Sequence, residues 1–152
     1  MMIKKEIMIN ANIKKVWNIF CQLENWPKWS GYITKTKWLS KQKWKVGSRF
    51  TQTIKGFGLF KDFKSIPKIV EIKPYKIITC AGTRKLIKGT HRFKFQKIGN
   101  KTKVVNIEYF TGPLAPIVFP LIKNKFEFYF EQFLNGLKKD AEKIYKQRKF
   151  SS

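Results

Sequence analysis

The strongest constraint on the fold is a change of hydrophobic period just after Gly112-Pro113. Before this point, β-branched and aromatic residues occur in short runs separated by turn residues, which is typical of strands. After it, apolar residues recur every three or four positions, as on one face of a helix. This apolar stripe comprises Phe119, Ile122, Phe126, Phe130, Phe133, Leu137, Ala141 and Ile144. Because such a helix buries its apolar face against a neighbouring layer, the sequence predicts an α+β fold with a C-terminal helix ending near Arg148.

Seven segments before this helix have the composition and the flanking turns of strands, and we expect a curved antiparallel sheet. They are Met1–Ile9, Tyr32–Leu39, Ser48–Lys55, Ile66–Lys73, Lys76–Gly82, Gly89–Lys97 and Thr102–Phe110. Two short helices separate the first two strands. Residues 10–23 have helical apolar spacing, and Pro27 can open a second helix that ends at Gly31. Without an internal repeat or a linker, residues 1–152 are expected to form one domain.

The composition excludes a disordered chain, because 43% of the residues are hydrophobic and 16% are aromatic. The 14 phenylalanines could fill a large core or line a large hollow, and composition does not distinguish the two. The longest apolar run, residues 114–122, is interrupted by Pro116 and Pro120. It is far shorter than the roughly 20 residues of a membrane span. The first ten residues lack a signal-peptide core, so we expect a soluble, cytoplasmic protein.

Several kinds of chemistry lack their usual sequence signals. Cys21 and Cys80 are the two cysteines, far apart, and one histidine is present, so neither a disulfide framework nor an all-protein zinc site is expected. No nucleophile motif, phosphate-binding glycine loop or HExxH sequence occurs. We therefore expect no metal and no cofactor.

A formal net charge of +24 is the most extreme feature of the composition. Such a charge attracts anionic membranes or nucleic acid. The alternative is that the charge reflects a lysine-rich composition and lies on a solvated surface without a binding role. Trp38 and Trp44 lie among lysines in KTKWLSKQKWKVGSRF. They could stack on bases, or they could simply be an inward strand residue and a loop anchor.

The hairpin around Gly99-Asn100 carries the most specific prediction. If these two residues form the turn, cross-strand partners have numbers that sum to 199. His91 then lies opposite Glu108, and Phe93 lies opposite Asn106. Strand alternation points these four side chains inward together with Phe95, Val104 and Phe110, and points Thr90, Arg92, Lys94 and Gln96 to solvent.

A slip of one residue in this hairpin would instead turn the other face of its second strand inward. Val105, Ile107 and Tyr109 would then be buried. This set is more apolar, so the hydrophobic pattern by itself slightly favours the slipped register.

In the first register, two polar side chains face an apolar interior and need partners. A hydrogen bond between His91 and Glu108 would satisfy both, raising the histidine pKa and lowering the glutamate pKa, whereas desolvation shifts each pKa the other way. Three readings stay open: a structural cross-strand pair, a polar anchor for a ligand, or an acid/base pair.

The order of these segments resembles a known superfamily over nearly the whole chain. The segments that carry the resemblance are INANIKKVWNIFCQLENWPKW, IVEIKPYKIITCAG, GTHRFKF and GNKTKVVNIEYFTGPLAPIVFPLI. They are similar to the START-related (SRPBCC) superfamily, and in particular to its polyketide cyclase/dehydrase-like branch, which has the helix-grip fold. In that pattern the positions of His91, Glu108 and Phe110 face inward, which supports the register that sums to 199.

The resemblance implies a cavity between the sheet and the long helix that holds lipids, sterols, polyketides or ring compounds. We expect Phe93, Phe95, Phe110, Phe126, Phe130 and Phe133 to form its walls, and His91, Asn106 and Glu108 to be its polar groups. The loop Gly56–Phe63, with Phe57 and Phe60, is either a lid or a hairpin tip packed on the helix.

Binding or carriage of a hydrophobic or amphipathic small molecule is the leading hypothesis. The superfamily has no shared catalytic set, so an enzyme would be inferred by analogy. The alternatives are a cyclase or dehydratase that uses His91 and Glu108, and a basic module that binds anionic membranes or nucleic acid.

Overall fold

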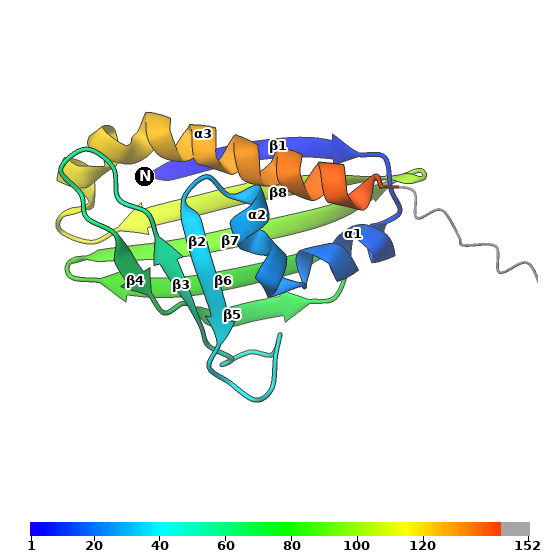
Figure 1. The fold of residues 1–152 in the computed structure, drawn as a ribbon, viewed down its shortest axis with the longest axis horizontal. Coiled ribbons are helices and arrows are strands. Elements are labelled where there is room, and N and C mark those ends of the chain that lie inside the picture. The colour runs from blue at the N-terminus through cyan, green and yellow to red at the C-terminus, as the bar shows by residue number, and fades with distance from the viewer. Residues whose placement is uncertain (144–152) are drawn as a thin grey trace, which may run out of the picture.

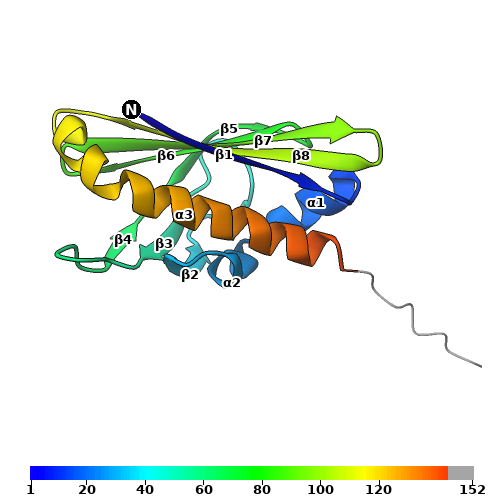
Figure 2. The ribbon, with the colours of Figure 1, turned by 90° about the horizontal axis from the view of Figure 1, so that it is seen from above.

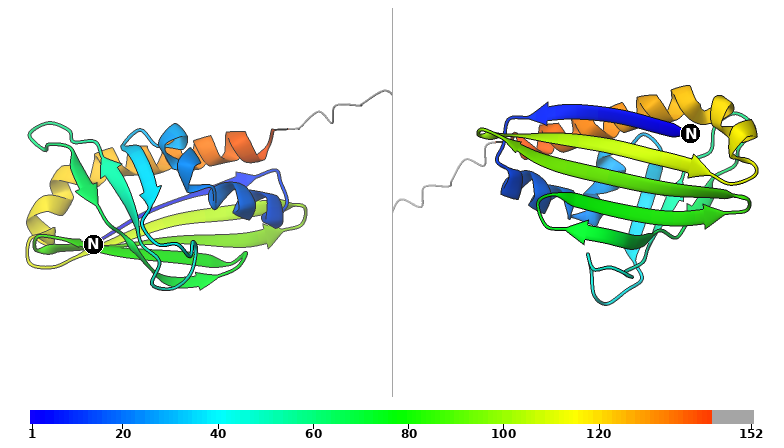
Figure 3. Two further views of the ribbon diagram at one scale, coloured as in Figure 1. Left: turned by 60° about the horizontal axis from the view of Figure 1, so that its bottom comes forward. Right: turned by 180° about the vertical axis from the view of Figure 1, so that it is seen from behind.

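The computed structural model describes residues 1–143 and shows an α+β fold with two antiparallel sheets (Figure 1). The larger sheet has the order β1-β8-β7-β6-β5, and the smaller has the order β2-β3-β4. The strands are β1 Met2–Ile9, β2 Ile33–Trp38, β3 Phe50–Ile54, β4 Phe63–Ser65, β5 Lys68–Lys73, β6 Ile77–Arg84, β7 Ile87–Ile98 and β8 Lys101–Thr111. The helices are α1 Ile13–Phe20, a 3-10 turn at Leu23–Asn25, α2 Trp26–Trp29 and α3 Ala115–Ala141. Figure 3 (right) shows the outer face of the larger sheet.

Helix α3 crosses one face of the larger sheet. The smaller sheet lies on the same side of the larger sheet as α3 (Figure 2). The buried side chains of α3 include Ile122, Phe130, Phe133 and Leu137, so the predicted apolar stripe faces inward. The long helix against an antiparallel sheet confirms the helix-grip arrangement. The expected helix end near Arg148, and Ile144 of the stripe, lie outside the described residues.

The hairpin register that sums to 199 is confirmed. His91 pairs with Glu108, Phe93 with Asn106, and Ile98 with Lys101, which leaves Gly99-Asn100 as a two-residue turn. Gly99 has a φ of +58°, a backbone conformation that glycine adopts without strain.

The described residues form eight strands in two sheets rather than the seven strands of one sheet that we expected. The additional strand is the short β4, which follows the loop after β3. Pro67 separates β4 from β5 and has no N–H to donate, so the ladder is interrupted there. The two sheets remain connected at this point by an Arg49–Lys68 bridge and by a 2.9 Å hydrogen bond from the Ile69 amide to the Ser48 carbonyl.

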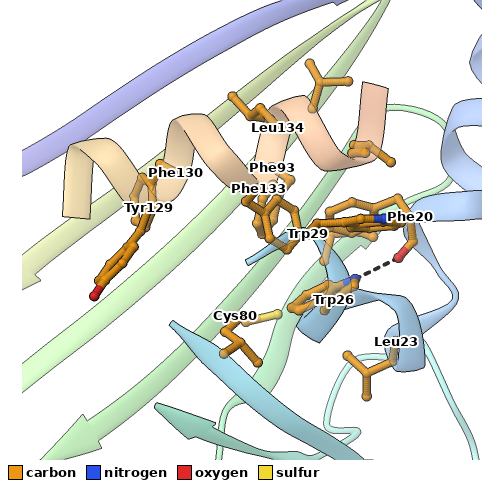
Figure 4. Close-up of a cluster of buried hydrophobic side chains, with 14 of the residues drawn as sticks. Phe20, Leu23, Trp26, Trp29, Cys80, Phe93, Tyr129, Phe130, Phe133 and Leu134 are labelled. Atoms are coloured by element: carbon orange, nitrogen blue, oxygen red, sulfur yellow. Dashed lines mark hydrogen bonds between the residues drawn. The ribbon is translucent and has the colours of Figure 1, made fainter. Parts of the chain in front are cut away.

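An aromatic cluster fills the space under α3 on the side of α1 and α2 (Figure 4). Phe20 lies at its centre, with its ring 4.7 Å from that of Phe93, and Trp26 packs edge-on to Phe133 at 5.5 Å. The Trp26 indole donates a 2.9 Å hydrogen bond to the Phe20 carbonyl, which satisfies its buried N–H. Packed aromatic side chains therefore occupy this half of the interior.

Trp38 and Trp44 belong to the edge of the same cluster. Their rings are 5.0 Å apart, and the Trp44 indole donates a 2.7 Å hydrogen bond to the Cys21 carbonyl. Both tryptophans therefore serve as packing residues in this structure, as the structural reading of the sequence proposed. None of the helices in residues 1–143 is both long enough and apolar enough to cross a membrane.

Candidate ligand-binding cavity

The other half of the interior is hollow. A cavity of about 400 Å³ lies between the two sheets and the N-terminal half of α3. The larger sheet contributes Cys80, Gly82, Thr83, Ile87, Gly89, His91, Phe93, Glu108 and Phe110. The smaller sheet and its loops contribute Phe50, Gln52, Ile54, Lys55, Gly56, Phe57, Phe60, Phe63 and Ser65. The remaining lining residues are Trp26, Tyr32, Pro67, Lys85, Leu114, Val118, Ile122 and Phe126.

Two glycines leave room for the cavity at the surface of the larger sheet. Gly82 of β6 and Gly89 of β7 are cross-strand partners, and both line the cavity. A Cβ atom on Gly82 would lie 3.8 Å from Oγ of Ser65 and 3.9 Å from Cα of Pro67, which are ordinary contact distances, so a side chain could begin there without a clash. A Cβ atom on Gly89 would lie 2.9 Å from Oε1 of Glu108, so the glutamate side chain occupies the space that Gly89 leaves free.

His91 forms a side-chain hydrogen bond with Asn106 and not with Glu108, its partner in the strand ladder. The hydrogen bond expected from the sequence between His91 and Glu108 is therefore wrong. Nε2 of His91 lies 2.5 Å from Oδ1 of Asn106, whereas its Nδ1 lies 4.0 Å from Oε2 of Glu108, beyond hydrogen-bond distance. The imidazole also stacks on the Phe130 ring at 5.1 Å and 14°. With the amide oxygen as acceptor, Nε2 carries the proton and Nδ1 presents a free lone pair.

Burial sets the protonation states of this pair. It lowers the pKa of His91 to about 4, against a smaller opposing effect of the Asn106 hydrogen bond, and it raises the pKa of Glu108 to about 8. The residual exposure of the two side chains, 17% and 15%, faces the cavity that both residues line. Near neutral pH the site therefore holds an uncharged imidazole and a largely protonated carboxyl group.

This arrangement offers one acceptor and one donor across a gap of 4.0 Å inside an apolar wall. A ligand hydroxyl could donate to Nδ1 of His91 and accept from the Glu108 carboxyl group, and a ligand carbonyl could accept from the carboxyl group, because neither residue satisfies the other. The Nδ2 group of Asn106 is buried without a hydrogen-bond partner, which adds to the unsatisfied polarity behind His91.

Cys80 is the one thiol on the cavity wall within the described chain. Burial raises its pKa to about 12, so the thiolate needed for nucleophilic attack is scarce at neutral pH. The described residues also contain no group of three histidine, cysteine or carboxylate side chains that could hold a metal ion.

The structure separates the expected wall residues into two groups. His91, Phe93, Glu108, Phe110 and Phe126 line the cavity, as do Phe57 and Phe60. Phe95, Asn106, Phe130 and Phe133 do not.

These four side chains are buried beside the cavity for identifiable reasons. Phe95 packs on Trp17 at 5.1 Å, and Phe133 lies in the aromatic cluster next to Trp26. Phe130 and Asn106 contact His91 and support its ring instead of facing the hollow.

Several lining residues were not singled out from the sequence. They include the polar residues Tyr32, Gln52, Ser65, Cys80 and Thr83, and the glycines Gly82 and Gly89. Alternation along β3, where Phe50, Gln52 and Ile54 share a face, could have identified Gln52. The two glycines could not be identified from the sequence, because a glycine that lines a cavity cannot be distinguished there from a glycine in a turn or a bulge.

The mouth of the cavity lies near the start of α3, where lining residues are exposed. Lys55 and Phe60 come from the loop between β3 and β4, and Lys85 comes from the turn between β6 and β7. Phe57 and Phe60 contact each other with ring centres 5.4 Å apart. The loop thus lies at the mouth, where a lid would be, and its motion stays a prediction.

The chain matches the family described as polyketide cyclase/dehydrase and lipid transport over residues 2–142, and it belongs to this family. The match extends from β1 to the end of α3, so it includes both the cavity and the residues around it. This membership supports a ligand-binding or cyclase role.

Solved structures share the fold at low sequence identity. A START superfamily protein from Mycobacterium smegmatis is 17% identical, with 93% of this chain and 97% of that chain covered and a TM-score of 0.75. The Zhui aromatase/cyclase from Streptomyces sp. R1128 is 12% identical, with 93% of each chain covered and a TM-score of 0.70. A hypothetical protein from Helicobacter pylori is 16% identical, with 93% and 88% covered and a TM-score of 0.72. No curated protein matches the sequence significantly.

Proposed function

We propose that this protein binds and carries an uncharged or amphipathic hydrophobic molecule in the cavity under α3. The observation that carries the proposal is the hollow itself. It has a volume of about 400 Å³, within the usual range for ligand sites, and mostly apolar walls with two inward polar groups that do not hydrogen bond to each other. A structural cross-strand pair would be expected to close that gap.

The polar groups indicate the chemistry of the ligand. A neutral Nδ1 acceptor and a protonated carboxyl donor favour a hydroxyl or carbonyl group on a ring or chain, because a charged group at this depth would remain poorly solvated. The apolar remainder of the ligand would contact Phe93, Phe110 and Phe126. The family's description, which includes lipid transport, agrees with such a ligand.

Native mass spectrometry of protein purified from the cells that normally produce it tests this proposal. We expect a bound species at one copy per chain, which is released on denaturation and has a hydroxyl or carbonyl group. Protein in which no ligand copurifies, and which also fails to bind an apolar fluorescent ring compound, would contradict the proposal.

Proton transfer on a bound carbonyl compound is a second candidate, favoured by the pKa of about 8 at Glu108. In a dehydration, the His91 imidazole would accept the proton next to the carbonyl, and the Glu108 carboxyl would protonate the departing hydroxyl as water. A β-hydroxyketone substrate should then lose water in the presence of the protein. Turnover that is unchanged in His91→Ala would remove this candidate, whereas lost turnover with retained binding would support it.

A further inference from the structure

We propose that the rim of the cavity mouth docks on anionic lipid bilayers. The rim consists of three segments: residues 55–62 between β3 and β4, residues 85–88 in the turn after β6 and the start of β7, and residues 112–121 at the start of α3. All three lie at the same end of the molecule in two perpendicular views (Figures 1 and 2).

Each rim segment exposes a large apolar side chain. Leu59 is fully exposed, Leu86 is 56% exposed, and Ile117 and Leu121 are 66% and 63% exposed. Single exposed leucines are ordinary on soluble proteins, but a group of them around one opening marks an interaction surface.

The three segments surround a single opening. Phe60, Lys85 and Leu114, one from each segment, all line the cavity. The turn also touches the start of α3, because the Leu114 amide donates a 3.5 Å hydrogen bond to the Leu86 carbonyl. The three segments that carry the exposed apolar side chains therefore border one entrance.

The turn between β6 and β7 has an unfavourable sequence for its shape. Lys85 has a φ of +51°, in a region where glycine or asparagine is preferred at hairpin turns. Lysine is disfavoured in this backbone conformation, and strained positions of this kind concentrate at functional sites. A basic and an apolar side chain next to each other are what an anionic bilayer surface would contact.

The charge of the rim complements an anionic surface. Its lysines, together with those directly adjacent to it, are Lys55, Lys61, Lys64, Lys85, Lys88, Lys123 and Lys125. The acidic side chains in these stretches are few. Asp62 accepts a 2.8 Å hydrogen bond from the Gly56 amide within its own loop, and Glu127 lies 3.9 Å from Lys123. Apolar side chains that insert at the headgroup level and lysines that contact anionic lipids are the two signals of a peripheral membrane protein.

Docking by this rim would place the cavity mouth against the bilayer, so that an apolar ligand could pass between lipid and protein without crossing water. This role in ligand transfer rests on the proposed function, whereas docking itself does not. Its test uses no ligand, so a failure of docking and a failure of ligand binding are separate results.

Vesicle flotation tests the inference. The vesicles are phosphatidylcholine, with and without about one quarter phosphatidylglycerol. The rim variant is Leu59→Ser, Leu86→Ser and Ile117→Ser. The matched control, at exposed apolar positions away from the mouth, is Leu39→Ser, Val46→Ser and Ile98→Ser. Because a net charge of +24 binds any anionic surface at low salt, the measurement is made at physiological salt.

We expect the wild-type protein and the control variant to float with the anionic vesicles and the rim variant to bind about tenfold less. Absence of wild-type binding at physiological salt, or an equal loss in both variants, would overturn the inference. Sedimentation of the wild-type protein is measured in parallel. A dimer that dissociates in the rim variant would assign this surface to a second copy of the chain. Retention on nucleic acid that only the rim variant loses would assign the surface to nucleic acid. Either result also overturns the inference.

Discussion

Nδ1 of His91 and Oε2 of Glu108 lie 4.0 Å apart across the wall of the cavity, on directly paired positions of β7 and β8. The gap exists because the imidazole is turned toward Asn106 and the carboxyl group lies over Gly89. Asn106 holds the far side of the imidazole through Nε2. The pair is thus positioned without being satisfied, which is the arrangement a ligand anchor needs.

Glu108 should make the stability of the protein depend on pH. A carboxyl whose pKa rises from 4.5 to about 8 on folding contributes stability that is complete below 4.5 and is lost as the pH rises through 8. His91, with its pKa lowered from 6.5 to about 4, opposes this slope below pH 6.5. Between pH 6.5 and 8 we expect the free energy of unfolding to fall by up to about 2 kcal/mol.

Urea unfolding across this pH range measures the effect. Glu108→Gln should remove the slope, because the substituted side chain does not ionise. Glu127→Gln, on the outer part of α3, should keep it. A slope that persists in Glu108→Gln would show that the carboxyl is already ionised in the folded protein.

His91 should stay uncharged far below its usual pKa. It is the single histidine of the chain, so one imidazole resonance reports on it without assignment problems. We expect its NMR titration midpoint near pH 4, and a nitrogen spectrum with the proton on Nε2. A midpoint near 6.5 would mean that water solvates the ring and that burial does not control its charge.

The aromatic cluster, rather than the cavity wall, should carry most of the packing energy. Phe20 is fully buried and contacts the rings of Trp26, Phe93 and Phe133. Phe20→Ala should lower the free energy of unfolding by about 3–5 kcal/mol, because it leaves a void that the surrounding rings cannot close.

Phe128→Ala is the matched comparison, since this ring is about half exposed on α3 and its neighbours include the Lys125 ammonium at 5.7 Å. We expect a loss of less than about 1 kcal/mol there. Denaturant midpoints measure both variants, and equal losses would contradict the central role of Phe20 in the buried packing.

The sequence predicted the elements that depend on local pattern. The period change after Gly112-Pro113 indicated α3, and Gly99-Asn100 indicated the turn that sets the hairpin register. Hydrophobic pattern by itself slightly favoured the slipped register, and the turn residues and the family resemblance gave the observed one. The period change and the turn residues are both local signals, so one sequence is enough to find them.

The details of the site were harder to predict because they depend on distances between elements. The sequence placed His91 opposite Glu108, but Asn106, next to Phe93 in the ladder, is the residue that reaches the imidazole. Which phenylalanines line the hollow depends on where α1 and α2 fill the interior. Phe133 faces Trp26, whereas Phe126 faces the cavity, although both lie on the same stripe.

Filling the cavity from its glycine floor is the most direct test of the central claim. Gly82→Val adds a side chain on the cavity face of β6, where its Cβ atom would contact Ser65 and Pro67 without a clash, while Ala81→Val adds one on the opposite face of the same strand. The probe is 1-aminoanthracene, an uncharged fluorescent ring compound whose binding does not depend on the net charge. We expect saturable binding to the wild-type protein and to Ala81→Val, and a loss of about tenfold or more in affinity for Gly82→Val with its folding retained. Equal affinity in all three proteins, or no binding to the wild type, would contradict a ligand site between the sheets and α3.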